Sequence, residues 1–103
     1  MKTLSIVIPA FNEENTILDI INKVQSVKLH GGIQKELIIV NDCSTDLTED
    51  YVNEFIKKNP KVTIAYHKHE KNKGKGAALT TGFSMATGNF VVVQDADLEY
   101  DPN

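Results

Sequence analysis

Apolar residues in this chain gather in four short runs rich in β-branched side chains, separated by three longer stretches that mix apolar and polar positions. Continuous runs of this kind are typical of strands that are buried on both faces of a parallel sheet. They cover residues 4–8, 36–40, 62–66 and 90–93. In the stretches between them, apolar side chains recur with the spacing of a helix. Helices are therefore expected around residues 17–27, 51–56 and 76–86, and Gly88 is well placed to cap the third at its C-terminus.

The elements follow the order β-α-β-α-β-α-β, and this alternation predicts an α/β fold with right-handed parallel crossovers. With 103 residues, of which 41% are hydrophobic, the chain fits one small domain. Sheets of this type bind ligands at the carboxyl ends of their strands, especially where the strand order reverses. Polar residues follow three of the predicted strands, at positions 9–14, 41–46 and 94–97. The sequence therefore predicts one polar site along a single edge of the sheet.

Asp95 and Asp97 follow the fourth predicted strand and are candidates for a metal site. In an extended segment alternate side chains point the same way, with Cα atoms roughly 6 to 7 Å apart. Mg²⁺ or Mn²⁺ prefers oxygen ligands and usually completes its octahedron with water and substrate phosphates. One aspartate would bind the ion directly, and the other would act through water or hold a ribose hydroxyl. The alternative is an ordinary solvated acidic turn.

Asp42 and segment 71–76 belong to the same predicted edge. Asp42 lies on the turn after the second strand, where its carboxylate is able to accept a hydrogen bond from a nucleobase N–H. Segment 71–76 precedes the third helix, and its glycines allow the backbone to approach a phosphate at the helix N-terminus. It does not match a P-loop, and the alternative is that its glycines only turn the chain and its lysines are solvated. Asp46 and Asp50 are expected to be N-terminal helix charges rather than catalytic groups.

Charge and composition restrict the possible partners. A net charge of −3 without a basic stripe argues against nucleic acid as a partner. All eleven basic residues are lysines, so phosphate must be held by point charges, backbone amides or a metal instead of guanidinium forks. Cys43 is the only cysteine, which suits a cytoplasmic protein and a small turn position. His30, His67 and His69 have no metal-ligand spacing with Cys43 and are expected in ordinary surface or packing roles.

Four segments of the chain together resemble glycosyltransferase family two, whose members have the GT-A fold. The segments read SIVIPAFNEE (5–14), VNDCSTD (40–46), NKGKGAA (72–78) and DADLEYDP (95–102). Within the family, the chain looks most like the polyprenyl-phosphate (dolichol-phosphate) mannosyl- and glucosyltransferases. The resemblance implies a three-layer α/β/α, Rossmann-like domain with a mainly parallel sheet. Residues 1–103 would be its nucleotide-sugar-binding half, with the acceptor-binding half absent.

The resemblance also implies roles for individual residues. A run in the first segment would line the nucleoside pocket. This run consists of Pro9, Ala10, Phe11, Asn12 and Glu13. Asp42 would contact the base, and Lys75 would lie near the pocket. Asp95 and Asp97 would hold the diphosphate and the metal, which is expected to be Mg²⁺ or Mn²⁺.

The chain departs from the family pattern at two positions of the second segment. Family members usually have Asp-Asp-Gly where this chain reads Asn41-Asp42-Cys43. Asn41 keeps a hydrogen-bonding group at its position. Cys43, however, lacks the freedom of glycine to adopt a positive φ, so the geometry of this turn is left open by the sequence.

The activity implied by the resemblance is an inverting, metal-assisted transfer of a hexose from a UDP- or GDP-linked donor. The favoured acceptor is a polyprenyl or dolichyl phosphate, with a glycan as the other choice. A lipid phosphate is already anionic and needs no general base, and no catalytic residue is identified in the chain. The parent protein would lie at the cytoplasmic face of a membrane, associating with it through the missing C-terminal part. The isolated 103-residue chain is expected to be inactive.

Two other interpretations compete with this one. The first is a non-catalytic fragment that binds a nucleotide sugar. The second is a phosphoacceptor receiver domain, which is also a small β-α alternation with acidic residues at its strand ends. A receiver needs an acidic pair after its first strand and an aspartate after its third, whereas Pro9-Ala10-Phe11 and Tyr66-His67-Lys68 stand there. The receiver domain therefore fits the sequence poorly.

Overall fold

The structure, a computed structural model, describes residues 2–96 of the chain. Strands and helices alternate in the predicted order. The strands are β1 (Thr3–Ala10), β2 (Gln34–Asn41), β3 (Ile64–Lys68) and β4 (Phe90–Val93). The helices are α1 (Ile17–Ser26), α2 (Thr48–Lys58) and α3 (Lys75–Met85). No helix among the described residues is both long enough and apolar enough to cross a membrane.

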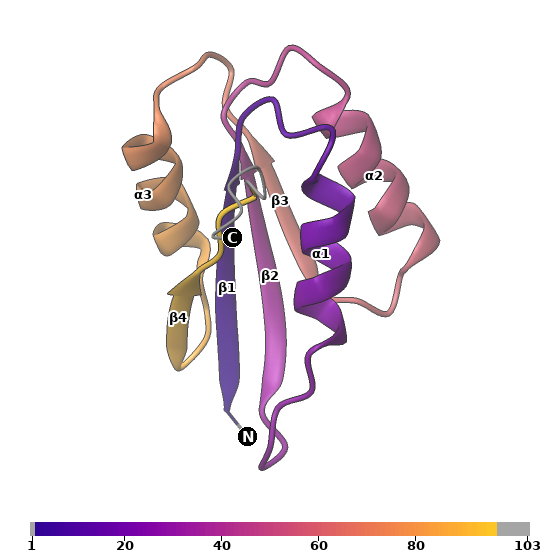
Figure 1. The fold of residues 1–103 in the computed structure, drawn as a ribbon. Coiled ribbons are helices and arrows are strands. Elements are labelled where there is room, and N and C mark those ends of the chain that lie inside the picture. Colours follow the sequence, from indigo (N-terminus) through magenta and orange to yellow (C-terminus); the bar gives the residue numbers. More distant parts are fainter. Residues whose placement is uncertain (1, 97–103) are drawn as a thin grey trace, which may run out of the picture.

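The strands form one parallel sheet in the order β3-β2-β1-β4 (Figure 1). The chain adds β2 and β3 on one side of β1 and then returns to add β4 on the other side. Because parallel crossovers are right-handed, this return moves the connecting helix to the opposite face of the sheet. Helices α1 and α2 accordingly cover one face and α3 covers the other, which is the three-layer arrangement that the sequence implies.

Two apolar clusters hold the three layers together. Beneath α1 and α2, the side chains of Ile6, Ile8 and Ile39 are buried with the inner faces of both helices. On the opposite face, Val7 of β1 packs in a cluster with Ala78 of α3. Successive side chains of a strand point to opposite faces, so the two central strands β1 and β2 supply both clusters. This is why their apolar runs are continuous rather than alternating.

Small residues bring α3 close to the sheet. Gly82 faces Val7 of β1, and a Cβ atom at position 82 would collide with the Val7 side chain. Ala78, one turn earlier, is also buried. This close packing fixes the helix against β1. Its first residue, Lys75, is thereby held at the carboxyl edge of the sheet.

The prediction that Gly88 caps α3 is wrong. The helix ends at Met85, and the next residue, Ala86, is already extended with φ −67° and ψ 132°. Gly88 lies instead against the start of β1, where its N–H donates to Ser5 Oγ at 2.9 Å. A Cβ atom at Gly88 would come within 2.7 Å of the Thr3 carbonyl oxygen. The position therefore requires glycine because the chain packs closely there.

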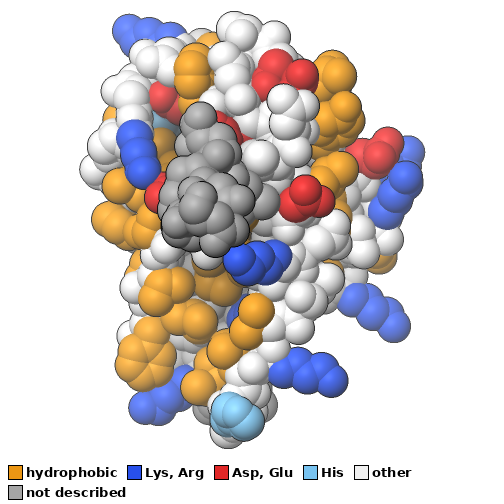
Figure 2. Space-filling model, in the orientation of Figure 1, with side chains coloured by type: hydrophobic (Ala, Val, Ile, Leu, Met, Phe, Trp, Pro, Cys, Tyr) orange, Lys and Arg blue, Asp and Glu red, His pale blue; other side chains and the backbone are white. Residues whose placement is uncertain are grey.

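The expectation that every strand is buried on both faces holds for β1 and β2 but is wrong for the outer strands β3 and β4. The β4 side chains, Phe90 to Val93, are each 42–49% exposed. Figure 2 shows hydrophobic side chains at the molecular surface over this part of the fold. Among the described strands β4 pairs only with β1, and α3 packs mainly on β1 and β2. The apolar run of β4 is therefore incompletely covered by the described residues.

Candidate functional site

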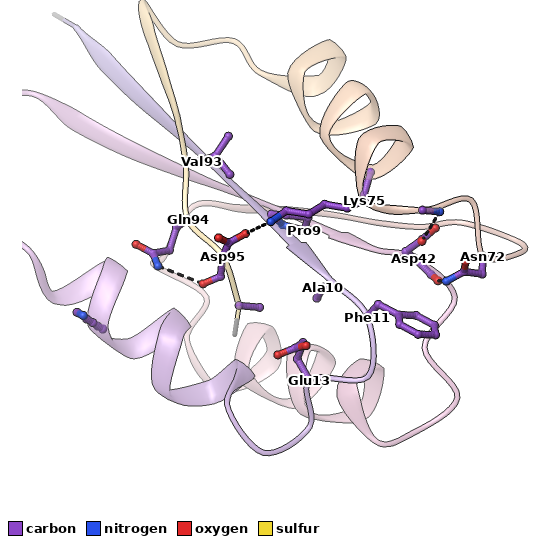
Figure 3. Close-up of a pocket in the computed structure, with 14 residues that line it drawn as sticks. Pro9, Ala10, Phe11, Glu13, Asp42, Asn72, Lys75, Val93, Gln94 and Asp95 are labelled. Carbon is purple, nitrogen blue, oxygen red and sulfur yellow. Dashed lines mark hydrogen bonds and ion pairs between the residues drawn. The ribbon is translucent and has the colours of Figure 1, made fainter. Parts of the chain in front are cut away.

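A cleft of about 710 Å³ opens at the carboxyl edge of the sheet, where β1 and β4 end and α3 begins (Figure 3). The strand order reverses at this point, because β1 and β4 are neighbours whose connections cover opposite faces. The structure brings most of the predicted site residues together in this cleft. Those that line it are Pro9, Ala10, Phe11, Glu13, Asp42, Lys75 and Asp95.

The turn after β1 presents an aromatic ring to the cleft. Phe11 is 43% exposed, and Figure 3 shows its ring on the same side of the cleft as Asp42 and Asn72. An exposed aromatic ring can stack on any nucleobase, since every nucleobase has a π-face. The neighbouring carboxylate and amide supply hydrogen-bonding groups for the edge of such a heterocycle. This end of the cleft is therefore suited to a nucleobase.

Asn12, which is also predicted to bind nucleotide, makes its hydrogen bonds to a neighbouring loop. Its Oδ1 accepts a hydrogen bond from Thr45 N at 2.8 Å, and its own N–H donates to Ser44 Oγ at 2.9 Å. Its φ of 52° is left-handed, a conformation that asparagine tolerates better than most residues. Asn12 therefore ties the loop after β1 to the loop after β2, while a contact between Asn12 and nucleotide stays a prediction.

Asp42 is 3% exposed, and its carboxylate is held by three donors from the segment after β3. His69 Nδ1 and Lys73 N lie 2.8 and 2.9 Å from Oδ1, and Gly74 N donates to Oδ2 at 2.8 Å. Burial acts to raise the pKa of Asp42, but the hydrogen bonds outweigh burial and hold the pKa below its usual range. Asp42 is therefore a carboxylate at neutral pH, and this group is a hydrogen-bond acceptor.

His69, for which the sequence predicts only an ordinary surface or packing role, is 4% exposed and bridges two elements. Its Nδ1 contacts Asp42, and its Nε2 lies 2.8 Å from Thr81 Oγ1 of α3. His69 directly follows β3 and therefore lies at the carboxyl edge of the sheet, a position that would mark it as a candidate site residue. The sequence pattern misses this position because the predicted strand ends at residue 66, whereas β3 continues to Lys68. His30 and His67 are exposed, as expected.

Lys75 and Asp95 form an ion pair in the cleft. Lys75 Nζ lies 2.6 Å from Asp95 Oδ1, and both side chains are more than half exposed, at 61% and 54%. An exposed pair of this kind stabilises a fold by only about 0.2–1 kcal/mol, so its partners can be exchanged for a charged ligand at little cost. Gly74, just before α3, has a φ of 96°, which glycine adopts readily. The N-terminus of α3 thus lies between two carboxylates: Gly74 N donates to Asp42, and the Lys75 side chain reaches Asp95.

Of the two predicted metal ligands, Asp95 is described by the structure, whereas Asp97 lies outside the described residues. Asp95 lines the cleft with a solvent-accessible carboxylate. Such a group is a suitable anchor for Mg²⁺ or Mn²⁺ when phosphate oxygens and water complete the octahedron. Within residues 2–96, no three His, Cys, Asp or Glu side chains converge on a possible metal position. The donors present therefore fit an ion held jointly by protein and phosphate.

The two residues that depart from the family pattern, Asn41 and Cys43, help to form the turn that carries Asp42. Cys43 adopts a φ of 62°, the left-handed conformation in which glycine is unstrained. Asn41 is fully buried; its amide donates to the Tyr66 hydroxyl at 3.0 Å, and its Oδ1 accepts from Ser44 N at 2.9 Å. The turn geometry that the sequence left open is thus a left-handed turn braced by Asn41.

Comparison with known proteins identifies relatives with related activities. The family model described as glycosyl transferase family 2 matches residues 5–103. A dolichol-phosphate mannosyltransferase of Pyrococcus furiosus is 31% identical over 99 residues, which make up 96% of this chain and 27% of that protein. The chain thus spans about a quarter of the length of this curated relative.

Two solved structures are similar to the fold described above. The mannosyltransferase PcManGT of Pyrobaculum calidifontis, in complex with GDP-Man and Mn²⁺, has a TM-score of 0.81 and 27% identity, covering 91% of this chain and 27% of that one. S. aureus TarS 1–349, in complex with UDP, has a TM-score of 0.81 and 28% identity, covering 94% of this chain and 28% of that one. The expected α/β fold of the GT-A glycosyltransferases is confirmed.

Proposed function

The chain belongs to glycosyl transferase family 2, and we propose that it forms the nucleotide-sugar-binding part of an enzyme that transfers a hexose from a UDP- or GDP-linked donor. The observation that carries this proposal is the convergence of chemically distinct groups on one cleft at the switch point of the sheet. An exposed aromatic ring and a buried carboxylate lie toward one end, the lysine and its exposed carboxylate partner lie toward the other, and the N-terminus of α3 lies between them. A nucleoside diphosphate needs both kinds of group.

Phe11 and Asp42 support a nucleoside at the first end of the cleft. The Phe11 ring offers a stacking surface, and such stacking contributes about 1–3 kcal/mol per base. A carboxylate has about four acceptor positions, of which protein donors use two on Oδ1 and one on Oδ2 of Asp42. A ring N–H of uracil or guanine would take the remaining position on Oδ2.

Lys75 and Asp95 support a diphosphate at the second end. Lys75 would exchange its ion pair with Asp95 for a phosphate oxygen, at the N-terminus of α3 where the helix dipole favours an anion. Asp95 would then be available to share a divalent ion with the phosphates. When bound, Mg²⁺ or Mn²⁺ neutralises the charge that develops on the departing nucleoside diphosphate.

For the acceptor we propose a polyprenyl or dolichyl phosphate, in line with the dolichol-phosphate mannosyltransferase that this chain resembles. An acceptor phosphate oxygen would form the new bond to the anomeric carbon as the bond to the donor diphosphate breaks on the opposite side. This displacement inverts the anomeric configuration. Because the attacking oxygen is already anionic, the described residues need not supply a general base.

A thermal-shift panel tests the donor site. The chain is heated with UDP, GDP, a UDP-hexose and a GDP-hexose, each with and without Mn²⁺. At about ten times its Kd, a ligand that binds only the folded state stabilises it by about 1.4 kcal/mol, which raises Tm by roughly 5–10 °C in a domain of this size. We expect such a rise with at least one nucleotide, and a larger rise when Mn²⁺ is present.

Variants of Lys75 and Asp95 distinguish the contribution of the metal to the thermal shift from that of the nucleotide. Asp95→Asn should remove the Mn²⁺-dependent part of the shift and keep the metal-independent part, whereas Lys75→Met should weaken both. Lys58→Met changes an exposed lysine at the end of α2 and serves as the matched control. The donor-site proposal fails if no nucleotide gives a metal-dependent shift, or if the Lys58 variant behaves like the Lys75 variant.

A further inference from the structure

We infer that His69 is a positioning residue for the nucleobase, which acts by orienting the Asp42 carboxylate in the cleft and joining it to helix α3. The inference rests on the proposed nucleotide site. His69 itself does not line the cleft in the described structure, whereas Asp42 does. Any effect of His69 on nucleotide binding must therefore pass through Asp42 or through the segment that His69 holds.

The contacts of His69 connect the end of β2, the Asp42 carboxylate and helix α3. Its backbone N–H donates to the Asn41 carbonyl at 2.9 Å, which continues the pairing of β2 and β3 up to the cleft. Its ring then lies between Asp42 Oδ1 and Thr81 Oγ1, with both nitrogens at 2.8 Å from their partners. Both the ring and the carboxylate are nearly inaccessible to solvent, with exposed fractions of 3% and 4%. Water therefore does not compete for these bonds.

The partners of the ring determine where its proton lies. A carboxylate only accepts hydrogen bonds, so His69 Nδ1 must carry the proton that it shares with Asp42. In the neutral imidazole Nε2 is then an acceptor, and the Thr81 hydroxyl donates to it. The Asp42 carboxylate thus fixes the tautomer in which Nδ1–H faces it, and the Thr81 hydroxyl completes the hydrogen bonding of the ring.

This arrangement restricts how Asp42 can meet a ligand. With Nδ1–H and Lys73 N on Oδ1, that oxygen is saturated, and the open acceptor position is on Oδ2. Loss of the Nδ1 donor would leave Lys73 N on Oδ1 and Gly74 N on Oδ2, and the carboxylate would be held less firmly in its orientation. The Asn72 amide, which lines the cleft, also donates to the Asp42 carbonyl at 3.3 Å, so the same segment sets a second polar group beside the base.

Two substitutions of His69 separate its two bonds. The amide of asparagine reaches the position of Nδ1 and keeps the donor to Asp42, whereas the amide of glutamine reaches the position of Nε2 and keeps only the contact with Thr81. The Kd of the full chain for UDP and for GDP, with Mn²⁺ present, is measured by calorimetry for the wild type, His69→Asn and His69→Gln. The free energy of unfolding of each ligand-free protein is measured by urea titration.

We expect His69→Gln to weaken binding of the preferred nucleotide by about tenfold, the effect of losing one hydrogen bond to a charged group. His69→Asn should restore affinity to within about threefold of the wild type, even though both substitutions lower the stability of the ligand-free chain. Equal losses in the two variants would overturn the inference, because a residue that only supports the fold does not distinguish them. Binding that is unchanged in His69→Gln would overturn it as well.

An NMR measurement on the wild type keeps the inference testable if a variant does not fold. The ¹⁵N shifts of His69 should show a proton on Nδ1, and addition of the nucleotide should shift the Nδ1–H resonance. The opposite tautomer would overturn the inference, since Asp42 would then receive no donor from the ring. If the wild type binds neither UDP nor GDP, the proposed function fails first, and the inference fails with it.

Discussion

At the scale of single residues, Cys43 occupies a strained backbone position in the turn that presents Asp42. Its φ of 62° is left-handed, which costs a residue with a Cβ atom about 1–2 kcal/mol. Cys43→Gly should relieve this strain, although glycine also gains freedom in the unfolded state. We therefore expect Cys43→Gly to be more stable than Cys43→Ala by about 0.5–1 kcal/mol.

Urea unfolding of the two Cys43 variants measures this difference. The alanine variant is the proper reference, because it removes the same thiol and its 3.6 Å contact with the Glu70 carbonyl but keeps the Cβ atom. Equal stability of the two variants would show that the turn relaxes out of the left-handed region in solution.

The sequence predicts the positions of those site residues whose place follows from the order of strands and helices. Pro9, Phe11 and Asp42 follow strands whose carboxyl ends must meet, so their presence at one edge follows from the topology. The partners of Asp42 could not be predicted in this way. They come from the segment after β3, about thirty residues further along the chain, and depend on side-chain directions that periodicity does not encode.

At the scale of elements, Lys35 of β2 closes the C-terminus of α1. Its ammonium donates to the carbonyls of Val24 and Gln25, at 2.9 and 2.6 Å, and to that of Val27. These carbonyls lie at the negative end of the helix, where a cation is favoured. Lys35→Met keeps the length of the side chain and removes the charge, and should lower the free energy of unfolding by about 1–2 kcal/mol.

Lys28→Met is the matched control for Lys35→Met. It makes the same chemical change in the loop after α1, at an exposed position. Chemical denaturation should show a loss of stability for Lys35→Met and a change within about 0.5 kcal/mol for Lys28→Met. Similar losses in both variants would mean that overall charge, and not the helix end, is responsible.

The boundaries of β3 show why elements are predicted better than their ends. The apolar run predicts a strand over residues 62–66, but the strand that forms covers Ile64–Lys68. Backbone pairing decides this, because His67 and Lys68 pair in register with Val40 and Asn41 although their side chains are polar and exposed. An outer strand tolerates such side chains.

At the scale of the whole molecule, hydrogen-bonded carboxylates join loops that are distant in the sequence. Glu36 of β2 accepts from Ser5 and from the backbone and side chain of Thr87, and Asp46 accepts from Glu14 N and from Thr48. Asp42 holds the segment after β3 in the same way. The apolar pattern predicts the layers of this fold, but it does not reveal these links, since each depends on one carboxylate reaching particular backbone or side-chain donors.

These links predict that acid loosens the fold. In Glu36, Asp42 and Asp46, burial acts to raise the pKa but hydrogen bonds outweigh it, so each folded-state pKa lies below the value of the unfolded chain. Their stabilising effect is therefore complete above the unfolded pKa of about 4 and is lost as the pH falls through the folded pKa. Urea titrations should show a free energy of unfolding that decreases steadily below about pH 5.

Asp46→Asn tests whether these carboxylates cause the acid sensitivity. The amide can still accept from Thr48 through its oxygen, but it no longer titrates and cannot offer a second oxygen to Glu14 N. The variant should be less stable than the wild type at pH 7 and should lose less stability on acidification. A wild-type stability that stays level down to pH 3 would contradict the prediction. So would a variant with an unchanged pH dependence, because the loss of stability would then come from groups outside this network.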